Sequence, residues 1–223
     1  MNTRTDRQIR IGAGIAAALL ALGFLLGGIL VLLVVSDQAP DVVAPLADPY
    51  VRSILGFTLM QAGLSTLLSV VLAIPLALAL HRARFAGKRA ILRLFLLPQA
   101  LPVLAGALAV ITIWGRNGVV SDGLAAVGLP QLDVYGLTGI LVAHVFFNMP
   151  LAARLFVAAL DRVPAEGWKL AGQLALPPFT VFRTIEWPAL RSALPGASAL
   201  IFMLCVTSFT IVLVLGGGPA ATT

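Results

Sequence analysis

Two polar side chains interrupt an apolar stretch in the second half of the chain, at a spacing that brings them together. His144 and Asn148 lie four residues apart in HVFFNMP, so in a helix they share one face. An imidazole and an amide in an apolar segment seek hydrogen-bond partners, which a neighbouring helix can supply. The alternative interpretation is that the pair lines a path for a solute.

Two further groups of small polar residues recur in other apolar stretches. The first is a stripe with a period of four residues: Gln61, Ser65 and Ser69. The second is a cluster of hydroxyl side chains: Thr207, Ser208 and Thr210. Small polar residues at such positions allow close packing of membrane helices, and they can also line a pathway. The candidate pathway residues are therefore His144, Asn148, Thr207, Ser208 and Thr210.

The chain lacks the sequence signatures of the common enzyme classes. It contains no G-x-x-x-x-G-K-[ST] loop for ATP, no H-E-x-x-H or C-x-x-C pattern and no G-x-S-x-G elbow. No apolar run contains the paired acidic residues of a proton-coupled carrier or an intramembrane aspartyl enzyme. The single cysteine, Cys205, lies in an apolar run and is expected to behave as a small hydrophobic residue. We expect no catalytic residue, metal or cofactor.

The composition places these polar groups in a membrane protein. Of 223 residues, 60% are hydrophobic and 11% are charged, against about half and about a quarter in soluble domains. Five apolar runs reach the length of roughly 20 residues that a helix needs to cross a bilayer. They cover residues 11–35, 53–80, 94–113, 136–160 and 192–215. Because none alternates with a period of two, we expect an all-α, polytopic transmembrane bundle.

The distribution of basic residues predicts the orientation of the bundle. Thirteen of the 15 Lys and Arg residues lie in the N-terminal tail, in segment 81–93 or in segment 154–191. Because Lys and Arg concentrate in cytoplasmic connections, we expect the N-terminus, the 81–93 loop and the 161–191 loop to be cytoplasmic. No aromatic residues are interleaved with the basic ones, as a single-stranded nucleic-acid surface would need. We therefore expect no nucleic-acid partner.

The long connection between the fourth and fifth runs, about 161–191, has its own pattern. It is too long for a tight helical connection. An amphipathic stretch at 164–176 precedes a Pro-Pro break at 177–178, and a second short stretch follows at 179–186. Two further prolines then lead the chain back toward the membrane. Helix, break and helix form a rigid knob for a soluble partner. An interfacial helix touching only lipid headgroups is the alternative, and the break favours the knob.

This connection resembles the EAA loop of ABC-importer permeases, whose pattern is E-A-A-x-x-x-G, nine residues, then I-x-L-P. The rear of the pattern matches at Ile185, Trp187 and Pro188. Counting back from this match places Lys169 at the glutamate position and Ala175 at the glycine position.

The front half of the pattern departs from the family. Glu166 and Gly172 have the right mutual spacing but lie three residues too early, so the rear register is preferred. The resemblance implies that the loop couples the chain to an ATPase through a defined set of residues: Glu166, Lys169, Gly172, Ala175, Ile185 and Pro188.

Four stretches resemble more closely the permeases of bacterial thiamine or thiamine pyrophosphate ABC importers. They are QLALPPFTVFRTIEWPALR, ALIFMLCVTSFTIVLVLGGGPAATT, HVFFNMPLAARL and the short basic N-terminus. The resemblance covers most of the chain from about residue 50. It implies a type I ABC-importer permease fold and the N-terminal half of a double-length permease. Residues 1–223 would then form one permease domain with five of its six spans, since LGGGPAATT marks a turn after the fifth.

The resemblance also implies a function and a set of partners. The chain would be the permease subunit of an importer in the bacterial inner membrane, moving thiamine or thiamine pyrophosphate from periplasm to cytoplasm. Its partners would be two copies of a cytoplasmic ATP-binding subunit, a periplasmic solute-binding protein, a second permease half and membrane lipid. ATP hydrolysis would occur in the ATP-binding subunit, so the chain would not be an enzyme. The alternatives are a ferric-iron or other small-solute ABC permease and, in another class, an ion-coupled secondary carrier or membrane-embedded enzyme.

Overall fold

The computed structural model describes residues 47–83, 85–115, 118–130 and 134–216, with eight isolated positions between 15 and 31. The expected first span, the orientation of the N-terminal tail and most of LGGGPAATT fall outside the described residues. The chain divides into two units, Met1–Arg52 and Ser53–Thr223. The second unit contains the residues discussed below.

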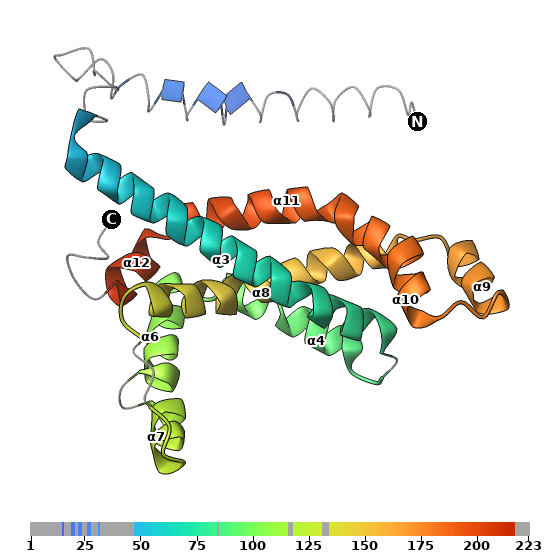
Figure 1. Ribbon diagram of the computed structural model, residues 1–223. Helices are drawn as coiled ribbons and strands as arrows, with labels where there is room; N and C mark the ends of the chain where they lie inside the picture. Colours follow the sequence, from blue (N-terminus) through green and yellow to red (C-terminus); the bar gives the residue numbers. More distant parts are fainter. Residues whose placement is uncertain are drawn as a thin grey trace, which may run out of the picture. The chain divides into compact units, whose positions relative to one another are not determined.

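The described residues after Asp48 form helices and turns (Figure 1). The elements are α3 (Pro49–Arg82), α4 (Lys88–Leu94), α5 (Leu97–Ala100), α6 (Val103–Trp114), α7 (Val119–Ala126), α8 (Leu137–Asp161), α9 (Ala165–Gln173), α10 (Pro178–Val181), the π-helical turn η1 (Phe182–Glu186), α11 (Trp187–Val206) and α12 (Phe209–Leu215). Four stretches are long and apolar enough to cross a membrane: Pro49–Arg82, Val103–Ala126, Leu137–Asp161 and Pro178–Val206. The prediction of an all-α, multi-span bundle is confirmed.

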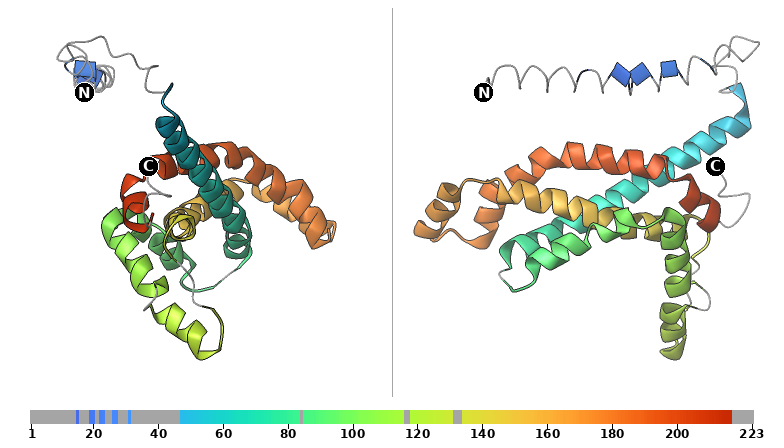
Figure 2. Two further views of the ribbon diagram at one scale, coloured as in Figure 1. Left: turned by 60° about the vertical axis from the view of Figure 1, so that its left-hand side comes forward. Right: turned by 180° about the vertical axis from the view of Figure 1, so that it is seen from behind.

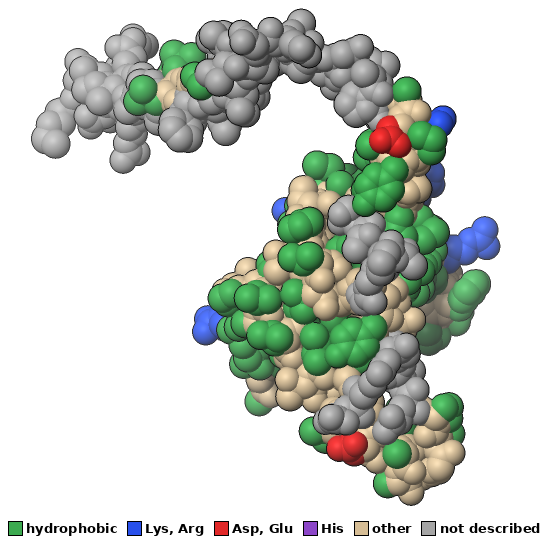
Figure 3. Space-filling view, turned by 90° about the vertical axis from the view of Figure 1, so that its left-hand side faces the viewer, with side chains coloured by type: hydrophobic (Ala, Val, Ile, Leu, Met, Phe, Trp, Pro, Cys, Tyr) green, Lys and Arg blue, Asp and Glu red, His purple; other side chains and the backbone are tan. Residues whose placement is uncertain are grey.

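Helices α3, α8 and α11 pack against one another around a shared hydrophobic core (Figure 2). Small side chains line the contact and let the backbones approach, as membrane helices require: Ala62, Ala73, Ala77, Ala152 and Ala153. Larger side chains fill the remaining space, among them Phe156, Leu190 and Ile201, which are buried. The outer surface is largely hydrophobic, with few charged side chains on the face shown in Figure 3. This surface suits contact with lipid.

The expected third span, 94–113, is divided between three helical segments. Leu101 is extended, with φ −73° and ψ 141°, and it separates α5 from α6. Proline has no N–H and disfavours the helical conformation in the residue before it, so Pro102 explains the interruption. The apolar run predicted a membrane segment, but hydropathy alone did not predict its break.

The expected fifth span, 192–215, differs from the structure at both ends. The helical path begins at Pro178 and runs through η1 into α11, so Pro188 and Pro195 do not separate the loop from the span. Pro188, which has no N–H to donate, is the second residue of α11, where the π-helical bonding of η1 has just changed to α-helical bonding. The path then breaks at Thr207 and Ser208, before α12. The loop is therefore continuous with the membrane helix and not hinged to it by proline.

Candidate functional site

The breaks in two membrane segments meet beside the middle of α8. A cavity of about 170 Å³ opens there, between the α5–α6 break, α8 and the α11–α12 break. Its polar lining consists of Gln99, His144, Asn148, Thr207 and Ser208. Four of the five candidate pathway residues therefore line one cavity, whereas Thr210 is not part of the lining. Gln99, which the sequence interpretation missed, lies between the two prolines that flank the α5–α6 break.

His144 joins three elements through its two ring nitrogens. Nδ1 lies 2.8 Å from Ser65 Oγ on α3, and Nε2 lies 2.5 Å from Ser208 Oγ at the α11–α12 break. Ser208 Oγ also donates to the Cys205 carbonyl oxygen at 2.7 Å. Because a hydroxyl has one proton, Ser208 accepts from Nε2–H. With a neutral imidazole, Ser65 then donates to Nδ1, so that both ring nitrogens of His144 are engaged.

The amide side chains extend this network. Asn148 Nδ2 donates to Cys205 Sγ at 3.3 Å, and Gln61 Nε2 donates to the Cys205 carbonyl at 3.4 Å. Gln99 Nε2 donates to the Phe147 carbonyl at 3.0 Å. His144 and Asn148 thus form hydrogen bonds between helices and also line the cavity, while their part in a solute path stays a prediction.

Two buried polar atoms on α3 have no hydrogen-bond partner among the described residues. They are Gln61 Oε1 and Ser69 Oγ, and both side chains are completely buried. An unsatisfied polar atom in an apolar interior is unfavourable unless something binds it at another stage. No group of three potential metal ligands occurs in the described part of the chain. The interior offers neutral donors and acceptors, which suit reversible binding of a polar solute.

The loop between α8 and α11 forms a compact turn with an exposed apolar tip. After α9, Ala175 adopts φ 46°, the one positive value at a non-glycine residue in the described ranges. Leu176 N donates to the Ala171 carbonyl at 3.0 Å, and Ala175 N donates to the Gly172 carbonyl at 3.1 Å. This pair of bonds is a Schellman motif, in which the Ala175 position usually holds glycine.

The side chains of the loop divide into a packed side and an exposed side. Leu170, Leu174 and Phe179 are exposed. Five of the six candidate coupling residues lie in three elements: Glu166, Lys169 and Gly172 in α9, Ile185 in η1 and Pro188 in α11. The sixth, Ala175, lies in the turn after α9. The left-handed conformation of Ala175 supports the rear register of the EAA pattern, because glycine favours that conformation.

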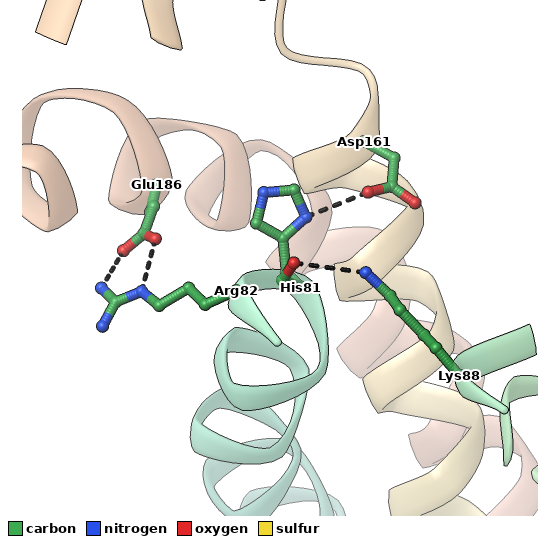
Figure 4. A network of polar contacts seen from close by, with 5 residues as sticks. All are labelled: His81, Arg82, Lys88, Asp161 and Glu186. Carbon is green, nitrogen blue, oxygen red and sulfur yellow. Dashed lines mark hydrogen bonds and ion pairs between the residues drawn. The ribbon is translucent and has the colours of Figure 1, made fainter. Parts of the chain in front are cut away.

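A second polar cluster lies where this loop meets the end of α3 (Figure 4). Arg82 donates to both carboxylate oxygens of Glu186, from Nε at 2.8 Å and from Nη2 at 2.5 Å. His81 Nδ1 lies 3.0 Å from Asp161 Oδ1, and the His81 ring contacts the Trp168 ring at a tilt of 37°, with centroids 5.2 Å apart. The cluster connects the ends of α3 and α8 to the loop.

Sequence reasoning placed the stretch 179–186 in the cytoplasmic connection and gave Glu186 no role. In the structure the Glu186 side chain is buried, with only 1% of it exposed. Its partner lies 104 residues away, so no local pattern could have paired the two residues. The sequence held one indication that Glu186 has a role, because it is an acidic residue, in EWP, in a chain with few acidic residues.

Comparisons with known proteins give the chain clear relatives, although no family model matches it. It is 55% identical to the thiamine transport system permease protein ThiP of Brucella abortus over 178 residues, which are 79% of this chain and 33% of that protein. It is 45% identical to ThiP of Escherichia coli over 211 residues, 94% of this chain and 39% of that protein. The chain thus spans about a third of the length of these relatives.

A more distant relative is the molybdenum transport system permease protein ModB of Mycobacterium bovis, 27% identical over 87% of this chain and 73% of that protein. Among solved structures, a bacterial ABC transporter that imports alginate matches 97% of this chain and 82% of its own, with a TM-score of 0.77 and 16% identity. The same kind of transporter in complex with an alginate-bound periplasmic protein gives a TM-score of 0.78 at 17% identity. The chain is therefore related in sequence to the thiamine transport system permeases, and it has the fold of an ABC-importer permease.

Proposed function

We propose that the chain is the transmembrane subunit of an ABC importer that moves thiamine or thiamine pyrophosphate into the cytoplasm. The observation that carries the proposal is an identity of 45–55%, over 79–94% of the chain, to permeases named for thiamine transport. The importer would lie in a bacterial inner membrane with the α9–α10 loop and the N-terminus on the cytoplasmic side. A second permease half, in the same or another chain, would complete the pathway.

The cavity at the helix breaks is the proposed contact point for the solute. Its donors and acceptors are neutral, so a solute can exchange hydrogen bonds with them without displacing an ion pair. The two helix breaks beside the cavity resemble the interrupted helices that form binding sites in other transporters. A periplasmic solute-binding protein would deliver the solute, and nucleotide binding in the ATPase would shift the permease between its states.

The exposed tip of the α9–α10 loop, which joins α8 to α11, is the proposed docking site for one of the two copies of a cytoplasmic ATP-binding subunit. Leu170, Leu174 and Phe179 supply an apolar surface, and Ala175 provides the close approach at the turn. Ala175→Glu places a charge at this contact, where leaving it unpaired costs several kcal/mol. We expect loss of ATPase association with membrane abundance unchanged, measured by co-purification from the membrane. Normal association would show that this turn is not the docking site.

The test of the proposed function uses the complete importer in proteoliposomes with its ATP-binding subunit and binding protein. Uptake of labelled thiamine, thiamine pyrophosphate and ferric iron is measured with ATP and without it. ATP-dependent uptake of thiamine or its pyrophosphate supports the proposal. Selective uptake of iron would favour the ferric-iron alternative, and uptake driven by an ion gradient without ATP would favour a secondary carrier.

A further inference from the structure

We propose that the Arg82–Glu186 ion pair is the joint through which movement of the α9–α10 loop reaches α3, and that both are positioning residues for transport. The inference rests on the proposed function, because it assumes that the loop receives movement from an ATPase. It goes beyond docking, since neither residue lies at the exposed tip of the loop.

The geometry of the pair suits a joint that transmits force. Two parallel hydrogen bonds, of 2.8 and 2.5 Å, fix the orientation of the guanidinium against the carboxylate. The Glu186 side chain is 1% exposed, whereas the Arg82 side chain is 49% exposed. Among the described residues, Arg82 is the one partner of the Glu186 carboxylate. The negative charge of the buried carboxylate is therefore balanced by a residue of α3.

The position of Glu186 in the chain connects the loop to a membrane helix. Glu186 is the last residue of η1, and the helical path from Pro178 to Val206 passes through it. π-helical turns inside helices often occur at functional sites. Because no flexible linker intervenes, a displacement of α10 moves η1 and the start of α11, and Arg82 holds α3 to that point (Figure 4).

A second contact between the same helices lies at the cavity. From Arg82, α3 runs back 17 residues, about 26 Å, to Ser65. Ser65 contacts His144, and His144 contacts Ser208, which lies just beyond the helical path from Pro178 to Val206, called the α11 path below. Helix α3 and the α11 path are therefore linked at two places, by an ion pair near the loop and through His144 at the cavity. A shift at the first link changes the relative position of the helices that the second link joins.

The test separates transmission from structural stabilisation. Arg82→Gln leaves a buried carboxylate unpaired and can prevent folding, so the decisive variant replaces both partners, Arg82→Met with Glu186→Leu. The double change removes the buried charge together with its partner, so no carboxylate is left unpaired in the interior, and Met provides an unbranched side chain at the half-exposed position of Arg82. Asp161→Asn is the matched control, because it changes an exposed carboxylate in the same cluster. All variants are made in the complete importer with its two partner proteins.

Three quantities are measured in proteoliposomes: ATPase association, ATP hydrolysis and solute uptake. The double variant is expected to fold, to bind the ATPase and to hydrolyse ATP, while uptake per ATP falls about tenfold, within the range typical of coupling between sites. The control is expected to keep the wild-type value of uptake per ATP. If the double variant also kept that value, or if it failed to bind the ATPase, the proposal that the ion pair transmits movement would be wrong. The proposed function is tested separately, by uptake through the wild-type importer. If that importer carries another solute, uptake per ATP is measured with that solute in all variants.

Discussion

The cavity around His144 and the joint at Arg82 both connect α3 to the α11 path, but they use different chemistry. The polar side chains that line the cavity are neutral. On α3, Gln61 Oε1 and Ser69 Oγ, which are not part of the lining, have no partners among the described residues. The joint pairs full charges, and both oxygens of Glu186 are bonded to one guanidinium. The joint lies at the last residue of α3, whereas Ser65 lies near the middle of that helix.

The difference follows from the cost of charge at different depths in a bilayer. A charged side chain is expensive at the centre of a membrane helix and much cheaper at its end, where water reaches it. Neutral hydrogen bonds are weaker and can be exchanged with a solute, whereas a bidentate ion pair holds one geometry. The molecule thus has exchangeable contacts at the cavity and a fixed contact beside the loop.

The largest effect is expected when a charge enters the cavity. Asn148 is 4% exposed, and Asn148→Asp introduces a carboxylate of the same shape. At the centre of a membrane helix such a residue costs about 2.5–3.5 kcal/mol. We expect a matching loss in the free energy of unfolding, measured by SDS titration of the purified protein. The control Asn148→Ala removes the bond to Cys205 without adding charge and should cost about 1 kcal/mol. Equal losses in both variants would show that the cavity tolerates charge.

A smaller effect is expected when the link at His144 is removed. His144→Leu deprives Ser65 Oγ of its acceptor, while Ser208 keeps its bond to the Cys205 carbonyl. Ser65 is completely buried, so an unsatisfied hydroxyl should cost about 1–3 kcal/mol. Adding Ser65→Ala should recover part of this loss, and the coupling energy comes from a double-mutant cycle in SDS unfolding. Strict additivity of the two changes would contradict the assigned bond.

The contrast also shows what the sequence could and could not predict. The apolar runs predicted the bundle. Four of the five pathway candidates, His144, Asn148, Thr207 and Ser208, lie beside one cavity, and their part in a solute path stays a prediction. The average hydropathy of a run does not report a break, so the α5–α6 interruption and Gln99 were missed. The Arg82–Glu186 pair was missed because its members are distant in sequence, and only packing of α3 against η1 brings them together.

A third test concerns the turn of the loop that the joint holds. Ala175 has a left-handed backbone, which costs an L-residue roughly 1–2 kcal/mol. Ala175→Gly removes this strain but gives the unfolded chain more freedom, so we expect the free energy of unfolding to rise by about 0.5 kcal/mol.

Gly172 lies inside α9, and nothing lies close to the position where a Cβ atom would be added. Gly172→Ala should therefore also stabilise the protein, by about 0.5–1 kcal/mol. Both are measured by thermal unfolding. Destabilisation by Gly172→Ala would favour the early register of the EAA pattern.

The smallest effect is expected at the exposed pair beside the joint. His81 and Asp161 lie 3.0 Å apart, but the Asp161 side chain is 56% exposed, and exposed pairs contribute about 0.2–1 kcal/mol. The His81 ring keeps its contact with Trp168 when the carboxylate is neutralised. The loss of stability caused by Asp161→Asn should therefore lie at the low end of that range and vanish in high salt.

Glu186→Gln is measured in parallel by SDS unfolding at low and high salt. Its loss of stability should be larger and depend less on salt, because the Glu186 carboxylate is buried and salt ions do not reach it. Equal losses with equal salt dependence would mean that burial does not distinguish the two pairs. The Arg82–Glu186 contact would then be an ordinary surface ion pair, and its geometry could not hold α3 to the loop.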